Sequence, residues 1–384
     1  MNIILYEKFL RYGEYMIYFD NAATGGKKPE NVIAAVLSSV KLCANPGRSG
    51  HKLSLAHAEK IFRTRKALSE FFDGYGYERV AFTKNCTEAL NLALLGLLSK
   101  GDHVVTTCME HNSVLRPLEF LKKQGIVSYD VCPLENGNIN PVTLAALVTE
   151  KTKAVVITTA SNVTGAIPPI EKIRAVLPPE ILLIADGAQG GGHIPVSMKK
   201  CGIDALALAG HKGLMGIQGS GALLFSDRIR PRPLLRGGTG SDSFSLEQPD
   251  FYPDALEAGT LSFPAAVSLF EGLKYLKVNG QADAQKLVDL TAYCIKKLNA
   301  VTNARVYSKP NPCGIVAFEI DGVSSETVAG DLSEKGFCVR GGFHCAPLMH
   351  EALNTSENGL IRASFSPFNS FAEIDLFISA LSSD

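Results

Sequence analysis

The sequence predicts an α/β protein with a large, mostly parallel sheet covered by helices, followed by a smaller α+β unit. Short β-rich runs alternate with helix-period segments over roughly residues 20 to 230, and such alternation is typical of parallel sheets. The runs are apolar on both sides, as expected for strands covered on both faces. The expected strands are 79–83, 102–107, 127–131, 153–159, 181–186 and 204–210.

Helices and loops are expected from the segments between and after these strands. Leucines recur at three- and four-residue steps, most clearly in 86–100, 111–125 and 169–177. The stretch 232–263 is rich in Gly, Pro and Ser and has no apolar period, which predicts a long and functional loop. Long helical patterns over 264–300 and then short strands follow. We expect a large domain of residues 20–263 and a small domain of residues 1–19 and 264–384.

Composition and charge favour an enzyme of small molecules over a binder of nucleic acid or membranes. Lys plus Arg number 38 and Asp plus Glu also 38, so no net field attracts polyanions. No apolar run approaches the roughly 18 residues of a membrane span, and the first residues lack a secretory signal. Residues 1–15 are either a genuine arm or the result of an upstream start codon.

Cysteine usage predicts a protein of the reducing cytoplasm. The nine cysteines are an odd number without any CxxC pair. This pattern indicates neither a disulfide framework nor a zinc site, and we expect no metal. Scattered free thiols are typical of a reducing compartment.

Two charged residues stand where expected strands end, the place where open α/β sheets bind ligands. Asp186 closes the run 181–186, and Lys212 follows the run 204–210 in a glycine-rich turn. An Asp can hold a pyridine nitrogen protonated, and a desolvated Lys can condense with an aldehyde as the neutral amine. Together they predict a site for pyridoxal phosphate (PLP). Taken singly, the Asp could be a helix N-cap and the Lys a solvated loop residue.

Further strand ends carry residues compatible with the same cofactor. A helix begins near Cys86, so Cys86 and Thr87 could bind phosphate through backbone N–H groups. His111 opens the next helix and could stack on the pyridine ring. Asn162 could reach the phenolic oxygen or a substrate carboxylate, and Gln189 follows the Asp by one helical turn. Each of these residues could also have a purely structural role, such as capping of a helix by Thr87. The prediction of a PLP site therefore rests on their joint occurrence.

A series of short motifs runs along nearly the whole chain. They are YFDNAAT (18–24), NPGRSGH (45–51), CTEALN (86–91), MEHNS (109–113), SNVTG (161–165), ADGAQ (185–189), GHK (210–212), EAGT (257–260), RGGFHCAP (340–347) and RASF (362–365). By these motifs the chain resembles the cysteine desulfurase and selenocysteine lyase family, the class V branch of fold-type I PLP enzymes. Two positions depart from the pattern: Ala209, where many relatives have a phosphate-binding Ser, and Leu256, where an aromatic residue is common.

The resemblance implies a role for each cofactor residue. PLP would be attached to Lys212, with Asp186 at its pyridine nitrogen and His111 against its ring. The other contacts implied within the chain are Thr87 and His211 at the phosphate and Gln189 at the phenolic oxygen. The family is dimeric, so the resemblance also implies that Gly238 and Thr239 of the long loop reach the phosphate bound by a partner subunit.

A second group of candidates surrounds Cys345 in the C-terminal part. RGGFHCAP places this thiol in a loop with His344 beside it and Arg340 nearby, and positive neighbours lower the pKa of a thiol. An ordinary cysteine, such as Cys294 within an apolar helix, is expected to be packing. The resemblance implies that Cys345 is the nucleophile and that Arg362 grips the substrate carboxylate in two-point fashion. The other substrate contacts it implies are Asn162, Ala23 and Arg340.

The implied reaction converts L-cysteine to L-alanine. Lys212 takes the α-proton, and Cys345 receives the sulfur as a persulfide that is later passed to an acceptor protein, as in iron–sulfur cluster assembly. L-selenocysteine is the alternative substrate, which would make the protein a selenocysteine lyase. Another class V reaction, such as transamination, would not need the cysteine, and a non-catalytic homologue is a further hypothesis.

Overall fold

The computed structural model describes residues 16–382, so the question of an arm at residues 1–15 lies outside it. The chain forms two compact units. The large unit comprises Lys28–Ser161 and Ala166–Ala282, and the small unit comprises the residues up to Lys27, Asn162–Gly165 and the residues from Asp283 onward. The predicted domain boundary at residue 263 stays a prediction. The two compact units divide the chain differently: residues 20–27 belong to the small unit, and the large unit ends at Ala282.

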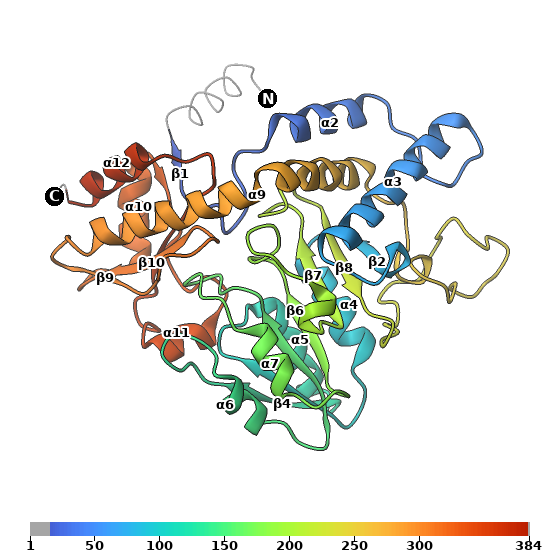
Figure 1. The fold of residues 1–384 in the computed structure, drawn as a ribbon, viewed down its shortest axis with the longest axis horizontal. Helices are drawn as coiled ribbons and strands as arrows, with labels where there is room; N and C mark the ends of the chain where they lie inside the picture. Colours follow the sequence, from blue (N-terminus) through green and yellow to red (C-terminus); the bar gives the residue numbers. More distant parts are fainter. Residues whose placement is uncertain (1–15, 383–384) are drawn as a thin grey trace. The chain divides into compact units, whose positions relative to one another are not determined.

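The large unit is built on a seven-stranded sheet with the order β2-β8-β7-β6-β5-β3-β4 (Figure 1). Only β8 runs antiparallel to its neighbours. Every expected strand forms, and β8 is an additional strand that the sequence did not suggest. The strands are β2 (Val80–Thr83), β3 (Asp102–Thr107), β4 (Val127–Cys132), β5 (Thr152–Thr158), β6 (Leu182–Asp186), β7 (Ala205–Ala209) and β8 (Gly221–Phe225).

The carboxyl ends of the parallel strands meet at one edge of this sheet. In register, Thr158 of β5 lies beside Asp186 of β6. At the other side Ala209 of β7 pairs with Gly221 of β8, which in turn pairs with Thr83 of β2. Because β8 is reversed, its first residue joins the last residues of its neighbours. The turns that follow β2, β5, β6 and β7 therefore start from the same edge.

Helices cover both faces of the sheet, as the apolar strands predict. Val156 and Ile184 belong to a core shared with Leu90 of α4. Val155 and Leu183, which alternate with them and face the other way, are equally buried. The helices that lie wholly in this unit are α2 (Glu30–Lys41), α3 (Lys52–Phe71), α4 (Cys86–Leu97), α5 (Asn112–Lys123), α6 (Pro141–Ala146), α7 (Ile170–Val176) and α8 (Met198–Cys201), with single 3₁₀ turns at Tyr77–Arg79 and Asp254–Leu256.

Helix α9 (Phe263–Leu298) runs from the large unit into the small one. Its 36 residues form one continuous helix where the sequence indicated long helical patterns. Charged and polar residues recur along it. Over residues 16–382, no helix combines the length and the hydropathy that crossing a bilayer would require.

The small unit is an α+β arrangement, as expected. Its antiparallel sheet has the order β12-β10-β9, and a two-stranded parallel pair joins β1 to β11 (Figure 1). Phe19, Phe318 and Phe377 are fully buried at its centre, with edge-to-face ring contacts at 5.6 and 6.2 Å. Its elements are β1 (Ile17–Tyr18), β9 (Ala304–Val306), β10 (Ile315–Ile320), α10 (Ser325–Glu334), β11 (Phe337–Cys338), α11 (Pro347–Leu353), β12 (Ile361–Ser364) and α12 (Phe371–Leu381).

Candidate active site

Asp186, the last residue of β6, is a buried carboxylate at the edge where the parallel strands end. Its Oδ1 accepts a hydrogen bond from the backbone N–H of Ala188 at 2.8 Å. The thiol of Cys86 donates to the same oxygen at 3.3 Å, which joins the end of β6 to the start of α4. Burial and the charge of Asp186 raise the pKa of Cys86 well above its usual range. Cys86 is therefore a protonated donor and not a nucleophile.

The N-terminus of α4 suits an anion. Asn85 caps the helix, with its side chain accepting a hydrogen bond from the backbone N–H of Glu88 at 2.9 Å. The N–H groups of Cys86 and Thr87 have no acceptor within the helix because they lie in its first turn. Together with the helix dipole they make this end a suitable site for phosphate.

His111 caps the next helix, α5, and its ring is held in one tautomer. Its Nδ1 accepts a hydrogen bond from the backbone N–H of Ser113 at 3.0 Å. An accepting Nδ1 carries no proton, so the proton of the neutral ring sits on Nε2. The Ser113 hydroxyl lies 2.9 Å from Nδ1 and 2.7 Å from Oγ1 of Thr87. Ser113 is not among the site residues predicted from the sequence, although MEHNS contains it.

Glu110 precedes His111 and is fully buried. Its Oε1 accepts hydrogen bonds from the Thr107 hydroxyl at 2.7 Å and from the backbone N–H of Thr158 at 2.9 Å. Its Oε2 has no hydrogen-bond partner among the described residues. Burial, with a smaller contribution from the charge of Asp186, raises the pKa of Glu110 to about 8. This neutral acid, which no sequence spacing indicated, joins the end of β3 to the end of β5.

Lys212 lies half-buried in a tight turn after β7. The carbonyl of Gly210 accepts a hydrogen bond from the N–H of Gly216 at 2.8 Å and closes the turn. A Cβ at Gly213 would lie 2.5 Å from the carbonyl oxygen of Gly191, so the turn requires glycine at that position. The lysine is thus presented by a closely packed turn, as the sequence predicted.

His211 and Lys28 stand next to this lysine. Nζ of Lys28 donates to the carbonyl of His211 at 2.7 Å, and burial lowers the pKa of Lys28 to about 8. Burial and the charges of Lys212 and Lys28 lower the pKa of His211 to about 4, so its ring is neutral at pH 7. Gln189 is buried in the turn after β6. The sequence analysis assigned no role to Lys28, and no spacing marks it.

Gly238 and Thr239 lie in the long loop, which carries only the 3₁₀ turn between residues 232 and 262. Arg48, from NPGRSGH, holds this loop by donating to the carbonyls of Gly238 and Gly259, both at 2.7 Å. Oγ1 of Thr239 lies 3.0 Å from Oγ of Ser241. The loop is therefore tied to the segment before α3 at Gly238, one of the two positions predicted to serve a partner subunit.

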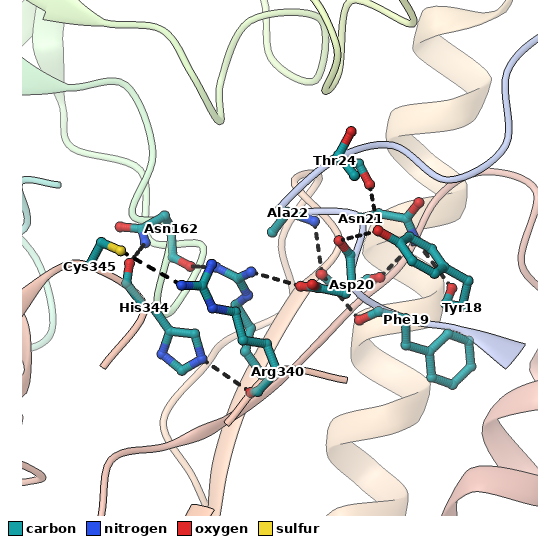
Figure 2. A network of polar contacts seen from close by, with 12 residues as sticks. Tyr18, Phe19, Asp20, Asn21, Ala22, Thr24, Asn162, Arg340, His344 and Cys345 are labelled. Carbon is teal, nitrogen blue, oxygen red and sulfur yellow. Dashed lines mark hydrogen bonds and ion pairs between the residues drawn. The ribbon is translucent and has the colours of Figure 1, made fainter. Parts of the chain in front are cut away.

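The remaining candidates lie in the small unit, and Figure 2 shows the polar contacts around three of them, Asn162, Arg340 and Cys345. Arg362 of β12 is 1% exposed and donates from Nη1 to the carbonyl of Asn162 and from Nη2 to Oδ1 of Asp20, both at 2.9 Å. Its Nε has no hydrogen-bond partner among the described residues. Ala23 lies in the turn after Asp20, with its N–H donating to the Asp20 carbonyl at 3.1 Å. The Nε–H of this buried guanidinium is therefore open to a ligand.

Cys345 lies beside a cation in a loop of unusual backbone conformation. Nη2 of Arg340 is 3.7 Å from its Sγ (Figure 2). His344 and Cys345 have φ values of 51° and 56°, so two successive residues other than glycine are left-handed. Nδ2 of Asn162 donates to the carbonyl of His344 at 2.7 Å. The loop is therefore connected to Arg362 through Asn162.

The position of the His344 ring corrects one expectation. The sequence predicts His344 as a positive neighbour of the thiol, but its ring is buried and its Nε2 lies 3.2 Å from the carbonyl of Arg340. Burial and the charge of Arg362 lower the pKa of His344 well below its usual range. The histidine is neutral, and the cation beside Cys345 is the Arg340 guanidinium.

The other cysteines are poorer candidates for chemistry. All nine are free thiols, and only Cys43, Cys338 and Cys345 are even partly exposed. Cys294 is fully buried in α9 and burial raises its pKa, as expected of a packing residue.

The predicted site residues fall into two groups, one in each unit. Asn162 follows β5 of the large unit in sequence, yet it groups with the small unit. The large unit carries Lys212, Asp186, Gln189, His111, Cys86, Thr87, His211, Gly238 and Thr239, and the small unit carries Cys345, Arg340, Arg362, Asn162 and Ala23.

Comparison with known proteins places this chain in a family. Residues 17–377 match the family model described as Aminotransferase class-V. A "Probable cysteine desulfurase" of Pyrococcus abyssi is 34% identical over 95% of this chain and 93% of its own length. The structure of a cysteine desulfurase from Thermococcus onnurineus NA1 superposes with a TM-score of 0.87 at 31% identity, covering 97% of this chain and 95% of that one. The cysteine desulfurase CsdA of Escherichia coli gives 0.85 at 25% identity, over 96% and 94%. The chain therefore belongs to the class V aminotransferase family, in its cysteine desulfurase group.

Proposed function

We propose that the chain is a PLP-dependent cysteine desulfurase that converts L-cysteine to L-alanine and receives the sulfur on Cys345. The observation that carries the proposal is the Cys345 loop, in which a partly exposed thiol lies 3.7 Å from the guanidinium of Arg340. Partial exposure leaves this sulfur accessible to a substrate, and the guanidinium of Arg340 donates a hydrogen bond to it. The names of the similar proteins support the same activity.

The residues of the large unit fit PLP. Asp186 is a buried carboxylate that already accepts an N–H donor, which suits a protonated pyridine nitrogen. The uncapped N–H groups at the start of α4 suit a phosphate. Lys212 would hold the cofactor, Gln189 its phenolic oxygen, His211 and Thr87 its phosphate, and His111 its ring. When bound, PLP supplies an electron sink for the α-carbon of the substrate.

The chain's own residues would perform the remaining steps. Arg362 would bind the α-carboxylate through its unpartnered Nε, and Lys212 would take the α-proton. Sγ of Cys345 would attack the sulfur of the substrate. An S–S bond forms and the C–S bond breaks, with its electron pair moving to the β-carbon, which is protonated to become the methyl group of alanine.

A homodimer and a sulfur acceptor belong to the same proposal. In the loop that holds Gly238 and Thr239, Phe244 and Leu246 are fully exposed apolar side chains, which favours coverage by a second copy. Light scattering is expected to give the mass of a dimer, and a monomer mass would contradict this. The persulfide on Cys345 would be passed to an acceptor protein of the cytoplasm, as for iron–sulfur cluster assembly.

The test compares wild type with Cys345→Ala for release of alanine and sulfide from L-cysteine, with reductant present. We expect the variant to lose cysteine turnover while the PLP absorbance is retained. Equal turnover in the variant would exclude Cys345 as the acceptor and favour another class V reaction. Parallel assays with L-selenocysteine decide between the two substrates, because a selenocysteine lyase would release selenide and turn over cysteine weakly.

A further inference from the structure

Next to Cys345 lies a buried chain of side chains that the proposed reaction does not use. Three residues of the small unit form it, His344, His350 and Thr355, which are 2%, 0% and 3% exposed. Nδ1 of His350 lies 2.8 Å from the Thr355 hydroxyl, and its Nε2 lies 3.5 Å from Nδ1 of His344. Nε2 of His344 lies 3.2 Å from the carbonyl of Arg340. This series of side-chain contacts thus runs from α11 and the turn after it to the backbone beside the thiol.

Only one neutral arrangement of protons satisfies all three contacts. The carbonyl of Arg340 can only accept, so Nε2 of His344 carries the proton and Nδ1 accepts. His350 must then donate from Nε2, which leaves its Nδ1 to accept from the Thr355 hydroxyl. The direction of every bond is therefore set by a carbonyl at one end and a hydroxyl at the other.

Burial and nearby charges keep the rings of His344 and His350 neutral. A second proton on His344 would place its Nδ1–H against the Nε2–H of His350, in the field of Arg340 and Arg362. Burial, followed by the charge of Arg362, lowers the pKa of His344 well below its usual range, and burial lowers that of His350. The directional arrangement is therefore the state at neutral pH.

This series of contacts ends at the Cys345 loop, whose backbone conformation is unfavourable unless surrounding contacts hold it. His344 and Cys345 are both left-handed, a conformation in which the Cβ of residues other than glycine is crowded. Such backbone persists only where its surroundings hold it. The His344 ring is held by His350 and by the carbonyl of Arg340, while the His344 carbonyl is held by Asn162. One residue thus anchors the loop on two sides.

We propose that His350 and Thr355 are positioning residues that hold His344 and Cys345 in the left-handed conformation and so keep the thiol beside Arg340. Neither residue reaches the thiol itself, and both act through the ring of His344. The inference rests on the proposed role of Cys345 as sulfur acceptor, and it concerns how that acceptor is presented.

The experiment replaces Thr355 by two matched residues in the full-length, PLP-loaded protein. Thr355→Val removes the hydroxyl and keeps the branched shape, whereas Thr355→Ser keeps the hydroxyl. His350→Phe removes both ring nitrogens, and Cys294→Ala is the control for a small loss of core packing in the same unit. The readouts are hydrogen–deuterium exchange of the 340–347 segment, kcat and KM for L-cysteine, and exchange of the α-proton of L-alanine with solvent deuterium. The last reaction needs no sulfur acceptor.

We expect Thr355→Val and His350→Phe to speed amide exchange of the 340–347 segment and to lower kcat, each on the order of tenfold. KM, the PLP absorbance and α-proton exchange are expected to stay at wild-type values, as are all readouts of Thr355→Ser and Cys294→Ala. A merely structural role would instead change α-proton exchange and PLP content together with kcat.

Unchanged exchange of the 340–347 segment in Thr355→Val and His350→Phe would overturn the inference. It is also overturned if Thr355→Ser behaves like Thr355→Val, because the hydroxyl would then have no role. If the wild type itself releases no sulfide, the proposed function fails, and amide exchange of the segment still decides whether the buried chain holds the loop.

Discussion

The guanidinium of Arg362 and the carboxylate of Asp20 form an ion pair of 2.9 Å, in which the Arg side chain is 1% exposed and the Asp side chain 23%. Burial lowers the pKa of Arg362, and the charge of Asp20 opposes this shift. The Asp of YFDNAAT, to which the sequence analysis gave no role, therefore keeps the buried arginine charged. A charged guanidinium is what binding of a substrate carboxylate requires.

The first prediction concerns this pair. Asp20→Ala is expected to destabilise the protein by about 3–5 kcal/mol, because it leaves a buried cation without its counter-ion. The measurement is urea-induced unfolding. Arg305→Gln is the matched control, since its pair with Glu319 is long, at 3.9 Å, and 74% exposed on the Arg side, so the change should cost less than about 1 kcal/mol. Similar losses in the two variants would mean that Asp20 does not compensate Arg362.

The second prediction concerns Glu110 and pH. Its pKa is raised from 4.5 to about 8 in the folded protein. Between pH 4.5 and about pH 8 the unfolded protein binds fewer protons at Glu110 than the folded protein does. The free energy of unfolding of the wild type is therefore highest below pH 4.5, and the contribution of Glu110 to it is lost as the pH rises to about 8. Gln does not titrate. Glu110→Gln should therefore gain stability relative to wild type between about pH 5 and pH 8, by at most about 5 kcal/mol.

Thermal unfolding of both proteins across that pH range tests the point. A difference in Tm that stays constant with pH would show that Glu110 is ionised in the folded state. Below about pH 4 the Tm values of wild type and variant are expected to change with pH in the same way, because the carboxyl of Glu110 is protonated in both the folded and the unfolded state.

The third prediction concerns Ser113. Ser113→Ala keeps the backbone N–H that donates to His111 but removes the hydroxyl that links it to Thr87. Loss of one hydrogen bond of about 1 kcal/mol should weaken PLP binding by roughly fivefold. Titration of the apo-protein with PLP, followed by absorbance, measures this affinity. Ser128→Ala, at an exposed position of β4, is the control, and equal affinity in both variants would remove Ser113 from the cofactor site.

The fourth prediction concerns the buried pair of Arg65 and Glu257. Two bonds of 2.6 and 2.5 Å join them, and Glu257 also accepts from the N–H of Phe82 at 2.6 Å. Glu257→Ala is expected to cost about 3–5 kcal/mol, because it leaves a buried guanidinium unpaired. Glu59→Ala breaks a pair of equal length with Arg63 whose side chains are about 60% exposed, and should cost about 1 kcal/mol or less.

Urea unfolding again provides the measurement. A loss in Glu257→Ala no larger than in Glu59→Ala would show that burial does not strengthen the pair. The expected result would explain the Glu of EAGT as the residue that ties the end of the long loop to α3 and β2.

Six strands of the large unit and the helices α4, α5 and α7 between them could be predicted from the sequence, because each strand is a local apolar run between turn residues. The same local pattern placed Asp186 and Lys212 at strand ends. Strand β8 was missed because Gly221–Phe225 follows β7 through a turn, with no helix between them to mark the alternation. The extra strand changes the sheet order but leaves the carboxyl ends of the parallel strands at one edge of the sheet.

What the sequence determined by itself is therefore the class of fold, the strand ends and the residue types that the chemistry needs. The tertiary structure decided how these residues are supported. Asp20 and Arg362 are 342 positions apart, and Asn162 and His344 are 182 apart. The neutral state of His344 arises from burial of its ring and from the charge of Arg362, which lies on β12. Local patterns encode periodicity and turns, whereas charge states and ring orientations depend on contacts that form only when distant segments fold together.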